Sequence, residues 1–62
     1  MKTIKELYGE GKLSTRTYNL IRRKTGESDI TIDDLFSRYG EDKIMGWSQA
    51  GPKTVNELKG LL

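Results

Sequence analysis

The chain has 62 residues, of which 34% are hydrophobic and 32% are charged, and its net charge at pH 7 is +2. A chain this short supports one core and therefore one domain, residues 1–62, and apolar residues throughout favour a compact helical domain over a disordered tail. Because Cys and His are absent, disulfide frameworks, thiolate zinc sites and the usual nucleophile–base pairs are excluded, so we expect no enzymatic activity, metal or cofactor.

The chain contains no candidate membrane or export segment. No run approaches the roughly 20 apolar residues that span a bilayer, and the first residues, MKTIKE, lack the apolar centre of a signal peptide. We therefore expect a soluble, cytoplasmic protein with no membrane partner and no small-molecule substrate.

The charges are distributed unevenly along the chain. Residues 12–24 carry five bases and no acid, whereas residues 25–42 carry six acids and one base. From residue 43 onward three lysines accompany a single glutamate. Two basic segments thus flank an acidic one. The net charge is too small to indicate a nucleic-acid partner, and the distribution of charge is more informative.

Apolar residues recur at intervals of three and four, which predicts an all-α fold, a compact bundle of about five short helices. The first helix is expected at residues 3–8, followed by the helix breakers Gly9 and Gly11. A second is expected at residues 15–24, capped by Ser14 and stopped by Gly26.

The second helix has two different faces. Tyr18 and Ile21 fall on one side, which we expect to face the core. Arg16, Asn19 and Arg23 follow the spacing i, i+3, i+7 on another side, which is polar and positive. A solvated helix surface is the ordinary explanation of such a face.

Three further helices follow. Residues 32–39 form the third, capped by Thr31, and its early Asp33 and Asp34 suit the positive end of the helix dipole. The fourth is expected at about residues 41–47 and the last from Pro52 or Lys53 to the chain end. Their predicted buried side chains are Ile32, Leu35, Phe36, Ile44, Met45, Trp47, Val55, Leu58, Leu61 and Leu62.

The stretch GWSQAGPKTV, residues 46–55, allows two starts for the last helix. Gly51 can be the N-cap with Pro52 at the first helical position, or Thr54 and Glu57 can form a capping box. We favour Gly51, because Pro52 disfavours a helical residue before it. Backbone N–H groups then lie open beside Lys53, as in an anion site. A simple Gly-Pro turn is the alternative, and spacing alone does not decide between them.

Other side chains have ordinary structural explanations. Tyr18, Tyr39 and Trp47 occur at helical spacing among aliphatic neighbours, so we expect core or core-rim positions rather than a stacking platform for bases. The carboxylates of the acidic segment suit helix starts and solubility, and we do not expect a metal site there.

Two segments together resemble a known family. Residues 13–23, LSTRTYNLIRR, resemble the LSxRxxNxLxR stretch of the C-terminal domain of the bacterial RNA polymerase alpha subunit. Residues 32–35, IDDL, resemble its V-x-x-L, and residues 49–58, QAGPKTVNEL, resemble its N-x-G-x-K-S-x-x-E-[IV] element. The resemblance runs in the same order from about Ile4 to Leu61.

The resemblance implies a fold with a helix-hairpin-helix-like element near the C-terminus and binding to the minor groove of A/T-rich DNA. Arg16 would enter the groove beside Asn19 and Leu20. The start of the last helix would hold backbone phosphates, and Glu57 would orient or buttress the basic residue. Including the basic face of the second helix, the implied DNA-binding residues are Arg16, Asn19, Leu20, Arg23, Gly51, Lys53, Thr54 and Glu57.

The chain also departs from the family pattern. Gln49 stands where the family usually has Asn, Pro52 replaces a frequent Lys, and residues 25–29 resemble an insertion. No polymerase assembly domain is present, so we expect a stand-alone relative, of bacterial or phage origin, or the N-terminal recognition domain of a longer protein.

The expected function is a small DNA-binding module acting in transcription, with double-stranded, A/T-rich DNA as partner. The alternative is a protein interaction module that mimics the polymerase domain and binds RNA polymerase or a transcription factor through residues 29–42, without binding DNA.

Overall fold

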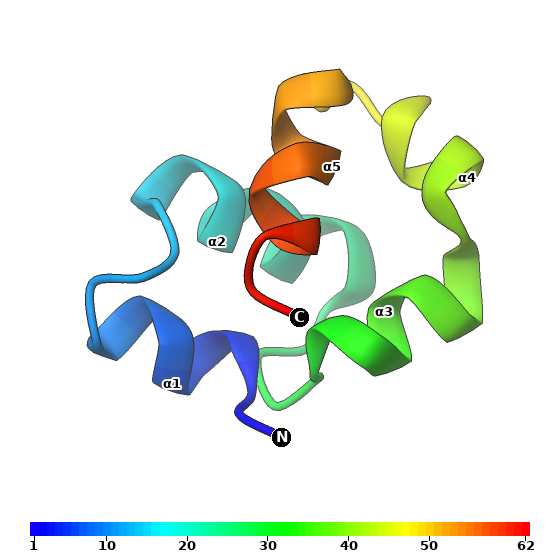
Figure 1. Ribbon diagram of the computed structural model, residues 1–62. Helices are drawn as coiled ribbons and strands as arrows, with labels where there is room; N and C mark the ends of the chain where they lie inside the picture. The colour runs from blue at the N-terminus through cyan, green and yellow to red at the C-terminus, as the bar shows by residue number, and fades with distance from the viewer.

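The computed structural model describes residues 1–62 and contains five α-helices and no strand (Figure 1). The helices are α1 (Ile4–Gly9), α2 (Thr15–Thr25), α3 (Ile32–Tyr39), α4 (Glu41–Met45) and α5 (Pro52–Lys59). The radius of gyration, 10.2 Å, is close to the ~10.6 Å of a compact chain of this length. The predicted all-α bundle of about five short helices is confirmed. None of the helices has the length and apolar character needed to cross a membrane.

The first three helices begin at hydroxyl residues that cap them. The side chains of Thr3, Ser14 and Thr31 each accept a hydrogen bond from the backbone N–H three residues further on. Glu6 completes a capping box on α1 by accepting the N–H of Thr3 at 3.0 Å. Gly26 ends α2 at φ 74°, a left-handed conformation that a side chain would strain. These local signals placed the predicted boundaries within one residue of the observed ones.

A single buried cluster joins all five helices. Its members are Ile4, Leu7, Leu13, Ile21, Ile30, Ile32, Leu35, Ile44, Val55 and Leu58. Each is at most 7% exposed. Burial of one such side chain contributes about 1.5–3 kcal/mol, a large share of the ~3–9 kcal/mol expected for a whole domain of this length.

The fourth helix is shorter than the prediction, since it ends at Met45 rather than Trp47. The N–H of Gly46 donates to carbonyls of the preceding turn and closes the helix there. Met45 is 41% exposed, so the prediction of a buried Met45 is wrong, whereas Ile44 is fully buried. Trp47 lies just past the helix and packs edge-on against Tyr39, with ring centroids 5.3 Å apart.

The last helix also ends earlier than expected, at Lys59, with Gly60 as its C-cap. Val55 and Leu58 are buried, and Leu61 packs half-buried against the cluster. Leu62 is 60% exposed. The predicted apolar stripe is therefore correct for the first three residues and wrong for Leu62.

A pair of stacked tyrosines joins α1 to α2. The rings of Tyr8 and Tyr18 are nearly parallel with centroids 4.2 Å apart. The Arg22 guanidinium lies 5.4 Å from the centroid of the Tyr18 ring, a cation–π contact. Tyr18 is half-buried at the core rim, as predicted.

In Figure 1 the helix α5 lies between α2 and α4. It contacts α4 directly and is joined to it by the turn at residues 46–51, so that the two form a helical hairpin. Toward α2, Glu57 forms hydrogen bonds with Ser14 and Thr17. The start of α5 lies at the hairpin turn, and its end lies near both chain termini.

Candidate functional site

The hairpin turn and the first turn of α2 form one open groove. It has a volume of about 430 Å³ and is lined by Arg16, Gln49, Ala50, Gly51, Pro52, Lys53 and Thr54. Arg16 comes from α2, and its Nη2 donates a hydrogen bond to the backbone carbonyl of Gln49 at 3.3 Å. The fold thus brings together the basic face of the second helix and the stretch before the last helix, which are separate features in the sequence. The two contacting residues are 33 positions apart.

The start of α5 is open toward this groove. Gly51 is the N-cap and Pro52 the first helical residue, as predicted, and no side chain caps the helix. The first intrahelical bond is donated by Val55 to the carbonyl of Gly51 at 3.1 Å. The N–H groups of Lys53 and Thr54 therefore have no partner in the protein. The side-chain caps of α1, α2 and α3 have no counterpart here, so the N–H of Thr54, at the third helical position, is also free at the positive end of the dipole.

Charge around the groove is positive. Four exposed ion pairs engage other bases, namely Lys2 and Lys12 with Glu10, Arg38 with Glu27, and Lys59 with Glu41. Arg16 and Lys53 are in none of them, and no acidic side chain lines the groove. An anion entering the groove would therefore meet two cations without displacing a carboxylate.

Two predicted residues lie outside the groove, further along α2. Asn19 and Arg23 are exposed and form no side-chain hydrogen bond or ion pair within the protein. Their spacing from Arg16, three and seven residues, places them on the same side of the helix. They extend the polar face beyond the groove without contributing to its lining.

Leu20 does not belong to this surface. Its side chain is 3% exposed, as is that of Thr17 one turn earlier, so both lie on the inner side of α2. The expectation that Leu20 lies beside Arg16 on the DNA-binding surface is wrong, because the residue after Asn19 is rotated by about 100° toward the core.

Glu57 contacts the helix that carries Arg16, not Arg16 itself. Its carboxylate accepts hydrogen bonds from the Ser14 N–H at 2.9 Å, the Thr17 hydroxyl at 2.7 Å and the Ser14 hydroxyl at 3.3 Å. These bonds attach α5 to the first turn of α2, so Glu57 buttresses the position of the helix. The alternative capping box with Thr54 does not form. Sequence reasoning missed the role of Ser14 and Thr17, because no local pattern links residues about 40 positions apart.

The pKa of Glu57 is lowered by this arrangement. Burial is the largest single influence and by itself would raise the pKa. The hydrogen bonds from the Ser14 backbone, the Thr17 hydroxyl and the Ser14 hydroxyl favour the carboxylate and together outweigh burial. Because the pKa is lower in the folded chain, ionised Glu57 stabilises the fold above the ordinary glutamate pKa of about 4.3, and this stabilisation is lost as the pH falls through the lowered value.

We expect Glu57→Gln to lower the free energy of unfolding at pH 7 by about 1–2 kcal/mol, because the amide nitrogen that replaces one carboxylate oxygen cannot accept the hydrogen bonds made to that oxygen, and the remaining oxygen is a weaker, uncharged acceptor. The difference from the wild type should shrink as the pH is lowered, since Glu57 then becomes protonated in both states. Urea unfolding at several pH values measures this. Glu27→Gln, which alters an exposed ion pair, should change stability by less than about 1 kcal/mol. A pH-independent difference for Glu57→Gln would contradict the assignment.

Gln49 has an unusual backbone conformation within the groove. The N–H of Ala50 donates to the carbonyl of Trp47 at 3.0 Å, which closes a four-residue turn. Gln49 is the third residue of that turn, and its φ of 69° is the only positive one outside glycine. A positive φ at this position is a feature of the type II turn, which favours Gly or Asn there.

Replacing Gln49 by Gly is expected to raise the free energy of unfolding by roughly 0.5–1 kcal/mol, because Gly adopts this conformation without steric cost. Ser48→Gly is the matched control in the same turn. Its φ is not positive, so the added chain flexibility should destabilise the protein slightly. Thermal unfolding of the two variants distinguishes them, and equal shifts would contradict the role of φ.

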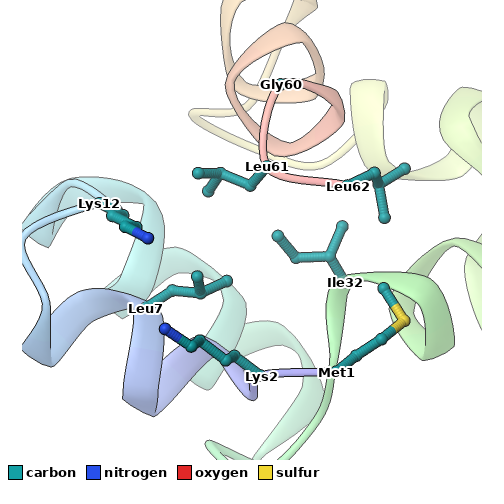
Figure 2. A pocket seen from close by; sticks show the side chains of 8 residues that line it. All are labelled: Met1, Lys2, Leu7, Lys12, Ile32, Gly60, Leu61 and Leu62. Carbon is teal, nitrogen blue, oxygen red and sulfur yellow. The ribbon is translucent and has the colours of Figure 1, made fainter.

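A second depression lies at the other end of α5 (Figure 2). Figure 2 shows Leu61 and Leu62 across from Leu7 and Ile32, so its walls are largely apolar. The two lysines at its edge share the Glu10 carboxylate. The hydrogen bond from Lys2 is the main cause that holds the pKa of Glu10 below its ordinary value. This depression lacks the free donors found at the start of α5.

Comparison of the chain with protein-family models, with curated proteins and with solved structures finds no match in any of the three. The resemblance to the polymerase alpha C-terminal domain therefore stays a prediction, carried by the motifs of residues 13–23 and 49–58.

Proposed function

We propose that this chain is a small double-stranded DNA-binding module that acts in transcription, inserting Arg16 into the minor groove of A/T-rich DNA. The start of α5 would hold a backbone phosphate at the same time. One observation carries the proposal: Arg16 and the open helix start at Gly51 line the same groove.

The phosphate half of the site follows from the helix start. The N–H groups of Lys53 and Thr54 have no partner in the protein, and the dipole of α5 favours an anion at this end. The Thr54 hydroxyl forms no hydrogen bond in the free chain, and the Lys53 ammonium is exposed. Such contacts fix the register of a protein on DNA without reading its sequence.

The minor-groove half follows from Arg16. A/T-rich tracts have a narrow minor groove with enhanced negative potential, which favours an inserted arginine. A guanidinium has five N–H donors, and one hydrogen bond to Gln49 leaves donors for the adenine N3 and thymine O2 acceptors. Arg16 therefore has both the charge and the free donors that binding in the minor groove requires.

The remaining predicted residues take supporting parts. Asn19 and Arg23 continue the exposed face of α2, and Arg23 lies about 10 Å along the helix from Arg16, within reach of neighbouring phosphates. Glu57 attaches α5 to α2 through Ser14 and thus sets the spacing of the two halves. With so few phosphate contacts, binding should be weak and strongly dependent on salt.

Titration of the 15N-labelled chain with an A/T-rich and a G/C-rich duplex at low salt tests the proposal. We expect the amide signals of residues 16–19 and 51–54 to shift first, and the A/T-rich duplex to bind more tightly. Unchanged signals in both segments would disprove the proposal.

A protein interaction module is the second candidate. Four aspartates of the acidic segment are exposed and form no ion pair, namely Asp29, Asp33, Asp34 and Asp42. A basic surface of RNA polymerase or of a transcription factor would complement them. Capture of such a protein by the chain, with no response to either duplex, would favour this candidate.

A further inference from the structure

We propose that Gln49 is a positioning residue for Arg16. In this view the backbone carbonyl of Gln49 holds the Arg16 guanidinium beside the start of α5 before DNA arrives. The inference rests on the proposed function, since it concerns how Arg16 is presented to the minor groove. It adds to the site a residue that acts through its main chain.

The geometry that supports this begins with the hydrogen bond itself. Arg16 Nη2 lies 3.3 Å from the carbonyl oxygen of Gln49, and Arg16 forms no other side-chain hydrogen bond and no ion pair. This contact is therefore the one polar restraint on an otherwise free guanidinium. Both groups line the groove that contains the helix start.

The carbonyl is itself held in place from both sides. On one side, Trp47 packs against Tyr39 at the core rim, and its carbonyl closes the turn by accepting the N–H of Ala50. On the other side the chain enters α5 at Pro52, whose ring limits the backbone. The left-handed conformation of Gln49 sets the direction of the carbonyl between these two anchors. A different φ at Gln49 would reorient the peptide group that Arg16 contacts.

The neutral character of the acceptor matters for function. Arg38, by contrast, is engaged by the carboxylate of Glu27 at 2.8 Å, and a carboxylate in that role at Arg16 would repel the phosphates of approaching DNA. A carbonyl orders the side chain without cancelling its charge. Ordering a flexible arginine in advance lowers the entropy that binding must otherwise remove. Gln49 thereby raises the affinity of Arg16 for DNA without touching the DNA through its side chain.

The test compares substitutions that keep or disturb the left-handed conformation. Gln49→Asn and Gln49→Gly permit a positive φ, whereas the β-branched side chain of Gln49→Val strongly disfavours it. We expect Gln49→Val to weaken binding to the A/T-rich duplex by about two- to tenfold, the equivalent of one lost hydrogen bond. Gln49→Asn should bind as tightly as the wild type, which rescues the effect with a conservative change. Urea unfolding of each variant confirms that the protein is folded under the binding conditions.

A double-mutant cycle with Arg16→Ala separates positioning from a general effect of the turn. If Gln49 acts through Arg16, Gln49→Val should have no further effect on affinity once Arg16 is absent. An equal loss in both backgrounds would mean that the turn acts on the phosphate half of the site, and would overturn the inference. Unchanged affinity of Gln49→Val would overturn it as well, while leaving the proposed function intact. A wild-type chain that binds neither duplex would instead remove the proposed function, and the inference with it.

Discussion

Arg16→Ala is expected to weaken binding to an A/T-rich duplex by about five- to a hundredfold, the range for loss of one base-contacting arginine. Arg16 is exposed and its only polar contact is with Gln49, so stability should change by less than about 0.5 kcal/mol. The preference for A/T-rich over G/C-rich DNA should fall at the same time, because the narrow minor groove is what favours the arginine. Fluorescence anisotropy with both duplexes measures the two effects.

Two control variants remove one positive charge elsewhere. Arg38→Ala changes the same residue type on α3, where the guanidinium is paired with Glu27. Lys59→Ala removes a lysine at the far end of α5, paired with Glu41. Both should bind within about twofold of the wild type, because a charge outside the interface contributes only through the screened field of the protein. If they lose as much affinity as Arg16→Ala, binding is nonspecific attraction and the assigned site is wrong.

Leu58→Ala is expected to have the largest effect on stability, a loss of about 2–5 kcal/mol. Leu58 is fully buried, and Val55 is the only other buried residue of α5. The free energy of unfolding of a domain of this length is only about 3–9 kcal/mol. A large fraction of the molecules should therefore be unfolded at 37 °C. Because α5 carries half of the groove, DNA binding should fall with the folded fraction.

Leu62→Ala is the matched control for this variant. Leu62 is 60% exposed, so the same change in side chain should alter the free energy of unfolding by less than about 0.5 kcal/mol. Urea unfolding followed by circular dichroism compares the two variants directly. Similar midpoints for Leu58→Ala and Leu62→Ala would show that α5 is not held by the core as described.

Most of the fold could be predicted because its signals are local. The hydroxyls of Thr3, Ser14 and Thr31 each bond to an N–H three residues away, and Gly26 ends α2 within its own turn. Such contacts depend on neighbours in the chain, so a sequence pattern is enough to find them. The predictions failed at the helix ends near residues 45 and 62, where apolar side chains are too few to reveal which of them reaches the core.

The candidate site could be predicted only in part. The open helix start at Gly51 follows from a Gly-Pro pair, and Arg16 stands out by its place on a basic helix face. Their meeting in one groove does not follow from either pattern. Leu20 illustrates the limit, because a single residue step from Asn19 turned its side chain from the surface into the interior.

The sequence by itself determined the number and order of the helices, the caps of α2, α3 and α5 and the basic character of α2, because these depend on hydrogen bonds and periodicities within a few residues. The tertiary structure alone decided that Glu57 anchors the start of α2 through Ser14 and that the carbonyl of Gln49 holds Arg16. Those partners are 43 and 33 residues apart. Only packing of α5 against the shared core brings them within hydrogen-bonding distance, and no local pattern encodes that geometry.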